Sequence, residues 1–318
     1  MAKAGTVALV GRPNAGKSTL MNRLLDERLS IVSDKPQTTR NRMVGILSRP
    51  EGQIVFYDTP GMHRPMHRLN REMVREANDA MAEADVVCLL SDVSEPFGKG
   101  DQFLFDLVTA VKAPKIALLN KIDRVAKAKL LPMLSRFAEG DHFRALIPIS
   151  AATGDGCERV LDEIWKLLPE GDPLYDTELL TIHPERFLVA ERIREKVLME
   201  TRNELPFSTA VLVEHWDDPG EGKLLRIHAA ILVERESQKK IMIGHRGAML
   251  TRVGTAARLD LEEFLGRRIY LDLQIRCEPD WRENPHVVRE LARDIHASNV
   301  DGDAALLEEL SGDRPDDD

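Results

Sequence analysis

Short, mostly apolar runs alternate with amphipathic stretches through the first half of the chain. The runs cover residues 6–10, 43–47, 53–57, 85–90, 115–119 and 145–149. Stretches with apolar side chains at three- and four-residue steps lie near residues 17–25, 69–84, 101–111, 127–138 and 158–168. The runs predict strands buried on both faces, and the stepped stretches predict helices. The alternation therefore predicts an α/β domain with a mostly parallel sheet covered on both faces by helices.

The pattern changes after residue 168. Residues 171–184 are expected to form a linker between a first domain, residues 1–170, and a second, residues 185–297. The second domain shows, in order, a helix over residues 185–204, strands over 209–214 and 224–233, two helices joined by a turn at 244–247, and a strand over 269–275. This αββααβ order predicts an α+β fold. A last helix is expected over residues 285–296, before an acidic tail at residues 298–318.

Composition and charge narrow the class of protein. With 318 residues, 43% of them hydrophobic, the chain can bury the cores of two medium-sized domains. Most of the net charge of −9 comes from residues 301–318, which carry one basic and eight acidic side chains, so a nucleic-acid partner for the rest is not excluded. No apolar run approaches the ~18 residues of a membrane span, and no signal peptide precedes Arg12, which leads us to expect a cytoplasmic protein. Cys88, Cys157 and Cys277 lack metal-ligand spacing and are expected to be reduced packing residues.

The first apolar run leads into a phosphate-binding pattern, G-x-x-x-x-G-K-S, and then a helix. Strand, glycine-rich turn and helix form the context in which this pattern cradles phosphate. The glycines let successive N–H groups point at one anion, Lys17 is expected to reach the β- and γ-phosphates, and Ser18 to ligate Mg²⁺. The predicted nucleotide-binding residues here are Gly11, Arg12, Pro13, Asn14, Ala15, Gly16, Lys17, Ser18 and Thr19.

Three further motifs follow predicted strands. The segment Asp58, Thr59, Pro60 and Gly61 offers a carboxylate that holds Mg²⁺ through water and an N–H that contacts the γ-phosphate.

The other two motifs identify the base. Asp123, after Asn120 and Lys121, can accept the N1–H and the exocyclic amine of guanine, which adenine does not offer in this arrangement. After the next strand, Ser150 and Ala151 supply a backbone N–H for the guanine O6. GTP is therefore the expected nucleotide.

Together these motifs resemble the translation-factor-related GTPases. The P-N-A-G-K-S-T-L segment and the loop at residues 36–40 resemble the Era-like GTPase family within that class. The resemblance implies that Thr39, with Thr38 as second choice, closes on Mg²⁺ and the γ-phosphate, so that Lys17, Thr39 and Gly61 surround the reacting group. It also suggests Asn14 as a ligand of K⁺. Met62 stands where Ras-type enzymes carry a water-orienting glutamine, which predicts slow intrinsic hydrolysis.

The second domain carries a helix–G-x-x-G–helix turn that suits single-stranded RNA. Backbones can approach closely at such a turn, so RNA phosphates lie across it while bases meet an apolar groove. Residues 235–258 contain six basic side chains and one acidic side chain. The predicted RNA-binding residues are Arg235, Lys239, Lys240, Ile243, Gly244, His245, Arg246, Gly247, Arg252 and Arg258.

This domain resembles a KH domain with an added N-terminal helix and strand. The resemblance to the Era-like family implies binding to the 3′ region of small-subunit ribosomal RNA, a role in 30S subunit assembly and loose contact with the membrane surface.

Two other functions compete with this interpretation. A P-loop kinase or metabolic NTPase is disfavoured because the motif at Asn120 serves guanine recognition. A passive RNA-binding module with a non-hydrolysing GTPase domain is disfavoured because every nucleotide motif is present. The related double GTPases need a second P-loop, which the sequence lacks.

Overall fold

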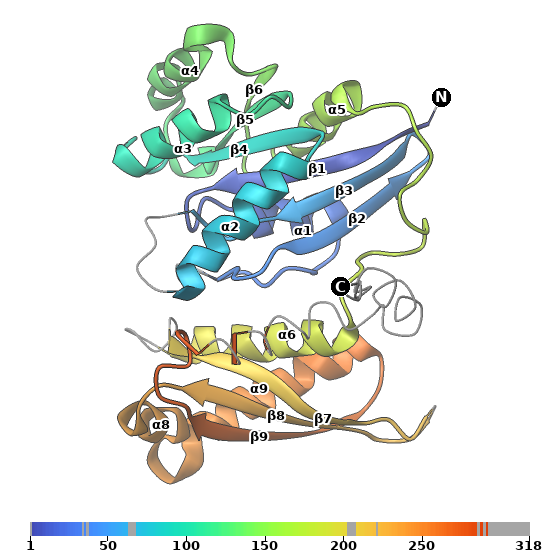
Figure 1. Ribbon diagram of the computed structural model, residues 1–318, viewed down its shortest axis with the longest axis vertical. Coiled ribbons are helices and arrows are strands. Elements are labelled where there is room, and N and C mark those ends of the chain that lie inside the picture. The colour runs from blue at the N-terminus through green and yellow to red at the C-terminus, as the bar shows by residue number, and fades with distance from the viewer. Residues whose placement is uncertain are drawn as a thin grey trace, which may run out of the picture.

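The computed structural model places a larger N-terminal domain against a smaller C-terminal one (Figure 1). It describes residues 2–33, 35, 38–62, 68–201, 208–220, 222–284, 287–288 and 291.

A six-stranded sheet forms the centre of the first domain. Its strand order is β2-β3-β1-β4-β5-β6, and all neighbours are parallel except β2, which runs antiparallel to β3. Most residues of its central strands are buried, as the unbroken apolar runs predict. The strands are β1 (Lys3–Gly11), β2 (Met43–Arg49), β3 (Gly52–Asp58), β4 (Val86–Asp92), β5 (Lys115–Asn120) and β6 (Ala145–Pro148).

Helices cover both faces of this sheet. Alternate residues of β1 point to opposite sides: Val7 and Leu9 pack with α1 and α5, whereas Ala8 and Val10 pack with α2, α3 and α4. The predicted α/β architecture is therefore confirmed. The α-helices are α1 (Lys17–Leu25), α2 (Arg68–Glu83), α3 (Lys99–Thr109), α4 (Leu130–Ala138) and α5 (Cys157–Leu167), and the 3₁₀ turns are η1 (Ile122–Arg124), η2 (Lys127–Lys129) and η3 (Glu139–Asp141).

The parallel strands bring the predicted motifs to one edge of the sheet. The strands β1, β3 and β5 end at Gly11, Asp58 and Asn120, and each of these residues begins a motif. Carboxyl ends of neighbouring parallel strands open on the same side, where ligands of such sheets bind.

The second domain packs helices on one face of a three-stranded sheet. Its strand order is β7-β8-β9, with β7 antiparallel and β9 parallel to β8. The αββααβ order predicted for this domain is confirmed. Its elements are α6 (Glu185–Glu200), β7 (Ala210–Asp217), β8 (Leu225–Val233), α8 (Glu236–Ile243), η4 (His245–Gly247), α9 (Ala248–Leu265) and β9 (Ile269–Cys277).

The expected linker is hydrogen-bonded to the first domain. It runs beside the edge strand β2, where the Leu180 carbonyl accepts the Ile46 N–H at 2.8 Å. Nε2 of the buried His183 accepts the Val44 N–H at 2.9 Å. Such contacts cover an otherwise open strand edge.

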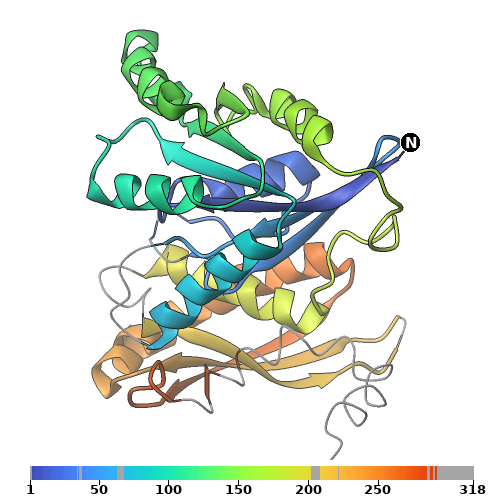
Figure 2. The same ribbon diagram turned by 45° about the horizontal axis from the view of Figure 1, so that its top comes forward.

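Helix α6 lies on the side of the second domain that faces the first (Figures 1 and 2). Phe187 and Leu188 near its start belong to the apolar core of the first domain. On the other face of the small sheet, Met73 of α2 packs in a cluster with Trp281. The two domains therefore share buried apolar contacts.

The remaining expectations concern the C-terminus and the cysteines. The helix expected over residues 285–296 and the tail at residues 298–318 lie almost entirely outside the described residues, although 287, 288 and 291 are helical. All three cysteines are free thiols, and burial raises the pKa of Cys88 to about 12.

No helix in the described part of the chain has the length and apolarity of a membrane span.

Candidate nucleotide-binding site and nucleic-acid surface

The turn after β1 has the backbone conformation of a phosphate cradle. Asn14 and Gly16 adopt φ angles of 62° and 97°, in the left-handed region. A Cβ atom at Gly16 would stand 2.2 Å from Nδ2 of Asn120, so only glycine fits. Helix α1 begins at the next residue, which directs its positive dipole end toward the turn.

Lys17 lies beneath this turn with 5% of its surface exposed. Its Nζ donates to the Gly11 and Arg12 carbonyls at 3.3 and 3.1 Å. Burial lowers the pKa of Lys17 to about 8, and the charge of Asp58 only partly opposes this effect. A phosphate would stabilise the charged ammonium that burial disfavours.

Ser18, Thr39 and Asp58 meet beside Lys17. The Ser18 and Thr39 hydroxyls are 2.9 Å apart, and Thr39 Oγ1 lies 3.5 Å from Asp58 Oδ2. Burial raises the pKa of Asp58, and its Oδ1 is buried without a hydrogen-bond partner among the described residues. Two hydroxyls and a carboxylate with an unused oxygen are the hard ligands that Mg²⁺ requires, so these residues fit the predicted metal.

Thr38 points elsewhere. Its hydroxyl donates to the Lys35 carbonyl at 2.6 Å, within its own loop. Of the two adjacent threonines, Thr39 is therefore the one that faces Ser18 and Asp58.

The segment after β3 approaches the P-loop closely. A Cβ at Gly61 would lie 2.6 Å from Cα of Pro13, and the hydroxyl of the buried Thr59 donates to the Leu9 carbonyl at 2.7 Å. Pro60 between them is buried. Met62 packs in the apolar cluster that includes α2 and β4 side chains, so its thioether points into the core.

The predicted guanine residues form one connected group. Asn120 donates to the Ala15 carbonyl at 2.7 Å and accepts the Ala151 N–H at 3.0 Å, so it joins the P-loop to the loop after β6. Ser150 donates to Asp123 Oδ1 at 2.6 Å, and Lys121 donates to Asp92 at 2.5 Å.

A cavity of about 360 Å³ is lined by residues of the P-loop and by Lys121 of the guanine motif. Several predicted nucleotide-binding residues do not line it: Arg12 pairs with Asp101 at 2.9 Å, and Ala15 packs in the core. The other predicted residues outside the lining are Gly11, Asp58, Thr59, Pro60, Asn120, Asp123, Ser150 and Ala151. The cavity is lined by Pro13, Asn14, Gly16, Lys17, Ser18, Thr19, Ile31, Val32, Ser33, Thr38, Thr39, Gly61, Lys121 and Arg124.

Three supporting residues were missed by sequence reasoning. Asn22 of α1 accepts the Leu29 and Ser30 N–H groups at 3.1 and 2.8 Å and donates to the Ser30 carbonyl at 2.7 Å. Ser30 in turn donates to Asp58 Oδ2 at 3.1 Å. Arg23 donates to the Ala152 carbonyl at 2.8 Å and thereby supports the loop after β6. These polar side chains belong to no recognisable motif.

In the second domain, the predicted G-x-x-G turn joins α8 to α9. Gly244 and Gly247 have φ angles of 74° and 81°, and Arg246 between them also lies in the left-handed region. A Cβ at Gly244 would lie 2.8 Å from the Met249 nitrogen, whereas one at Gly247 would meet nothing within 4 Å. The His245 and Arg246 side chains are exposed beside the turn.

The other predicted RNA-binding residues flank this turn. Arg235, Lys239 and Lys240 are on or next to α8, and Ile243 is partly buried against the domain core. Two arginines on α9 have acidic partners: Arg252 pairs with Glu200 at 3.2 Å, and Arg258 pairs with Glu262 at 2.7 Å.

Each of the two domains matches a known protein family. Residues 6–121 match the family described as "50S ribosome-binding GTPase", and residues 204–282 match the KH domain family. The fold and the motif geometry thus define a P-loop GTPase domain followed by a KH domain.

Relatives of nearly the same length share this arrangement. The chain is 44% identical to GTPase Era of Geobacter metallireducens, over 91% of this chain and 97% of the relative. It is 43% identical to GTPase Era of Heliobacterium modesticaldum, over 92% and 97%. The chain therefore belongs to the Era family of GTPases.

Two solved structures are similar over the whole fold. A crystal structure of an Aquifex aeolicus Era variant bound to GDP·AlF4⁻ has a TM-score of 0.87 at 39% identity, covering 91% of this chain and 98% of that one. A structure of Era with MgGDPNP and nucleotides 1506–1542 of 16S ribosomal RNA has a TM-score of 0.88 at 39% identity, covering 92% and 99%.

Proposed function

We propose that this chain binds GTP with Mg²⁺, hydrolyses it to GDP and phosphate, and binds the 3′ region of 16S ribosomal RNA in assembly of the 30S subunit. One observation carries the proposal: a similar Era structure that covers 92% of this chain holds both MgGDPNP and that RNA. The convergence of Ser18, Thr39 and Asp58 supports the nucleotide half. Assembly of the 30S subunit places this protein in the cytoplasm.

The proposed reaction joins a water oxygen to the γ-phosphorus and breaks its bond to the β–γ bridging oxygen. Lys17 and the N–H groups after Gly11 stabilise the negative charge on the phosphate oxygens. Bound Mg²⁺, held by Ser18, Thr39 and, through water, Asp58, neutralises charge on the β- and γ-phosphates. Because the Met62 thioether is buried in the core and cannot orient water, backbone groups or a partner position the attacking water, and intrinsic turnover is slow.

We also propose that K⁺ assists at Asn14, which lines the phosphate end of the cavity. Replacing K⁺ by Na⁺ is expected to lower GTP turnover on the order of tenfold, well short of the effect of an arginine finger. The Asn14→Gly variant removes the side chain and tolerates the φ of 62°, so it should turn over slowly in either salt. Steady-state phosphate release in matched chloride salts measures the effect. Equal rates of the unaltered chain in K⁺ and Na⁺ exclude this role for Asn14.

For the KH domain, aspartate at both Gly244 and Gly247 is expected to remove RNA binding and leave GTP binding intact. Two carboxylates at the turn would repel the RNA phosphates and weaken binding at least about 30-fold. Filter binding with a single-stranded 16S 3′-end RNA, in GDP and in a GTP analogue, measures the effect.

The matched control for this experiment is Gly266→Asp, which makes the same change at the other end of α9. Gly266 has a φ of 63° and open space around it, as Gly247 has at a φ of 81°, so it is matched to the single variant Gly247→Asp. Aspartate at Gly244 would in addition meet the Met249 nitrogen, so the single Gly247→Asp variant is measured beside the double variant. Unchanged RNA affinity in the double variant contradicts the assignment of the turn. Equal affinity of the unaltered chain in the two nucleotide states contradicts coupling between the domains.

A further inference from the structure

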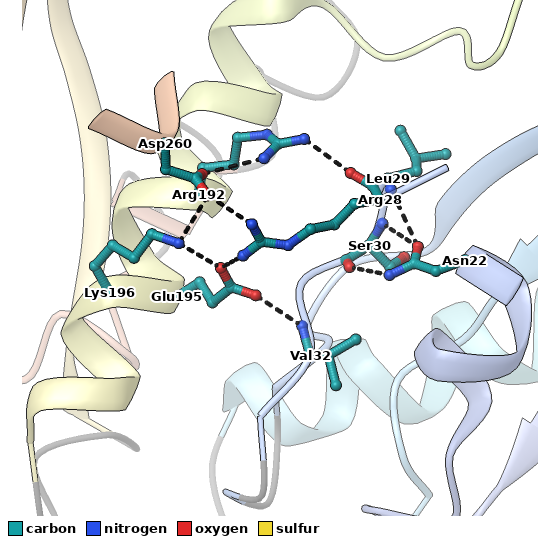
Figure 3. A network of polar contacts seen from close by, with 9 residues as sticks. All are labelled: Asn22, Arg28, Leu29, Ser30, Val32, Arg192, Glu195, Lys196 and Asp260. Atoms are coloured by element: carbon teal, nitrogen blue, oxygen red, sulfur yellow. Dashed lines mark hydrogen bonds and ion pairs between the residues drawn. The ribbon is translucent and has the colours of Figure 1, made fainter. Parts of the chain in front are cut away.

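An ion-pair network joins the KH domain to the loop between α1 and β2 (Figure 3). Arg28 of this loop reaches two carboxylates of the KH domain. Its Nη1 lies 2.6 Å from Oδ1 of Asp260 on α9, and its Nη2 binds Oε2 of Glu195 on α6. The side chains of Glu195 and Asp260 are 1% and 9% exposed, so this contact takes place largely away from water.

The network satisfies both buried carboxylates. Lys196 lies between them, with its Nζ 3.0 Å from Glu195 and 2.9 Å from Asp260. Arg192 pairs with Asp260 at 3.1 Å and donates to the Arg28 carbonyl at 2.8 Å. Burial alone disfavours the Asp260 carboxylate, but the hydrogen bonds from Lys196 and Arg192 and the charge of Arg28 hold its pKa below the usual value. Asp260 is therefore charged at neutral pH.

The KH domain also binds this loop on both sides of Thr39, through the loop backbone before it and through a loop side chain after it. Glu195 Oε1 accepts the Val32 N–H at 3.1 Å. Further along, Arg194 donates to the Thr38 carbonyl, immediately before Thr39. Arg40, immediately after it, donates to the Thr209 carbonyl at 2.6 Å.

The same loop is fixed from the opposite side by the nucleotide site. Asn22 binds the backbone of Leu29 and Ser30 (Figure 3). The Ser30 hydroxyl in turn donates to Asp58. Only one residue separates Ser30 from Arg28. A shift of the backbone at Arg28 would therefore disturb the hydrogen bond from Ser30 to the Asp58 carboxylate. The loop thus carries Thr39 and lies between Ser18 and Asp58 on one side and the KH domain on the other.

We propose that Glu195, Asp260 and Arg194 of the KH domain are positioning residues of the GTPase site, which hold the loop where Thr39 reaches Ser18 and Asp58. This inference rests on the proposed function. Since Thr39 serves the γ-phosphate and Mg²⁺, the network stabilises the GTP complex more than the GDP complex. By thermodynamic linkage, GTP stabilises the docking of the KH domain to the same extent.

The test compares Arg28→Ala, Asp260→Ala and the double variant in the full chain. Affinities for GDP and for a non-hydrolysable GTP analogue are measured by calorimetry over a range of Mg²⁺ concentrations. Each single variant is expected to lose about tenfold in analogue affinity relative to GDP affinity, and to need more Mg²⁺ for half-maximal GTP turnover. The double variant should lose less than the product of the two single losses, because the Arg28–Asp260 pair is absent from both single variants. Arg28→Lys should recover part of the loss.

The control is Asp218→Ala, which removes an Arg267–Asp218 pair of 2.6 Å in the same domain but away from the loop. It should leave the ratio of the two affinities unchanged. Arg28→Ala changes a half-exposed side chain. The inference is overturned if this variant has the same ratio of analogue affinity to GDP affinity, and the same Mg²⁺ dependence of turnover, as the control. If the unaltered chain binds neither nucleotide, the proposed function fails and this inference fails with it.

Discussion

Lys17→Ala is expected to abolish measurable binding of GTP and GDP. Lys17 is buried beneath the P-loop, and its Nζ is held by two main-chain carbonyls, close to where the phosphates are expected. Removing one partner of a desolvated charge pair costs about 3–5 kcal/mol, which corresponds to a loss of roughly 10²- to 10⁴-fold in affinity. Calorimetric titration with each nucleotide in the presence of Mg²⁺ measures this loss.

The pH dependence provides a second check on Lys17. Because burial lowers its pKa to about 8, the free protein carries the charge below pH 8 and loses it above. Phosphate favours the charged form, so nucleotide affinity should decline as the pH rises through about 8. The exposed Lys127, on the same domain, serves as a control when replaced by alanine. An affinity of Lys17→Ala within threefold of that control would contradict the role assigned to Lys17.

Most of the fold could be predicted because the signals are local. Strands buried on both faces require continuous apolar runs, and amphipathic helices require apolar residues at three- and four-residue steps, so each element is visible within its own segment. The expected linker is the main exception. Proline and glycine at residues 169–173 indicate a break in regular structure, but they carry no information on the hydrogen bonds between Leu180 or His183 and the edge of β2.

The nucleotide motifs could be predicted for the same reason, whereas their supports could not. A P-loop or an Asn-Lys-x-Asp segment places its functional groups within a few consecutive residues, and the parallel sheet brings the segments together. Arg28 and Asp260 are 232 positions apart, and each reads as an ordinary surface charge. Arg40 is buried next to Arg194, and no hydrophobic periodicity in the sequence predicts this burial. Such pairs exist only because α6 and α9 dock on the loop.

Asp123→Asn is expected to change the base preference from guanine to xanthine. In the structure, Asp123 Oδ1 accepts the Ser150 hydroxyl at 2.6 Å, and Oδ2 lies 3.8 Å from Nε of Arg124. An asparagine can keep its carbonyl oxygen on Ser150 and present its amide N–H₂ to the base. Guanine offers a donor at C2 and would face this second donor, whereas the C2 carbonyl of xanthine would accept from it.

The reversal of base preference should be large. A site with buried polar groups discriminates by about 10⁴-fold against an analogue that leaves those groups unpaired. Competition between XDP and GDP for the Mg²⁺-loaded protein measures it in both forms of the chain. Asp141→Asn is the matched control, because Asp141 is exposed on the same domain and its φ of 50° tolerates asparagine. If Asp123→Asn retained its preference for GDP as this control should, Asp123 would not be the group that reads the base, and the path from Asn120 through Ala151 to the guanine O6 would have to carry the selectivity alone.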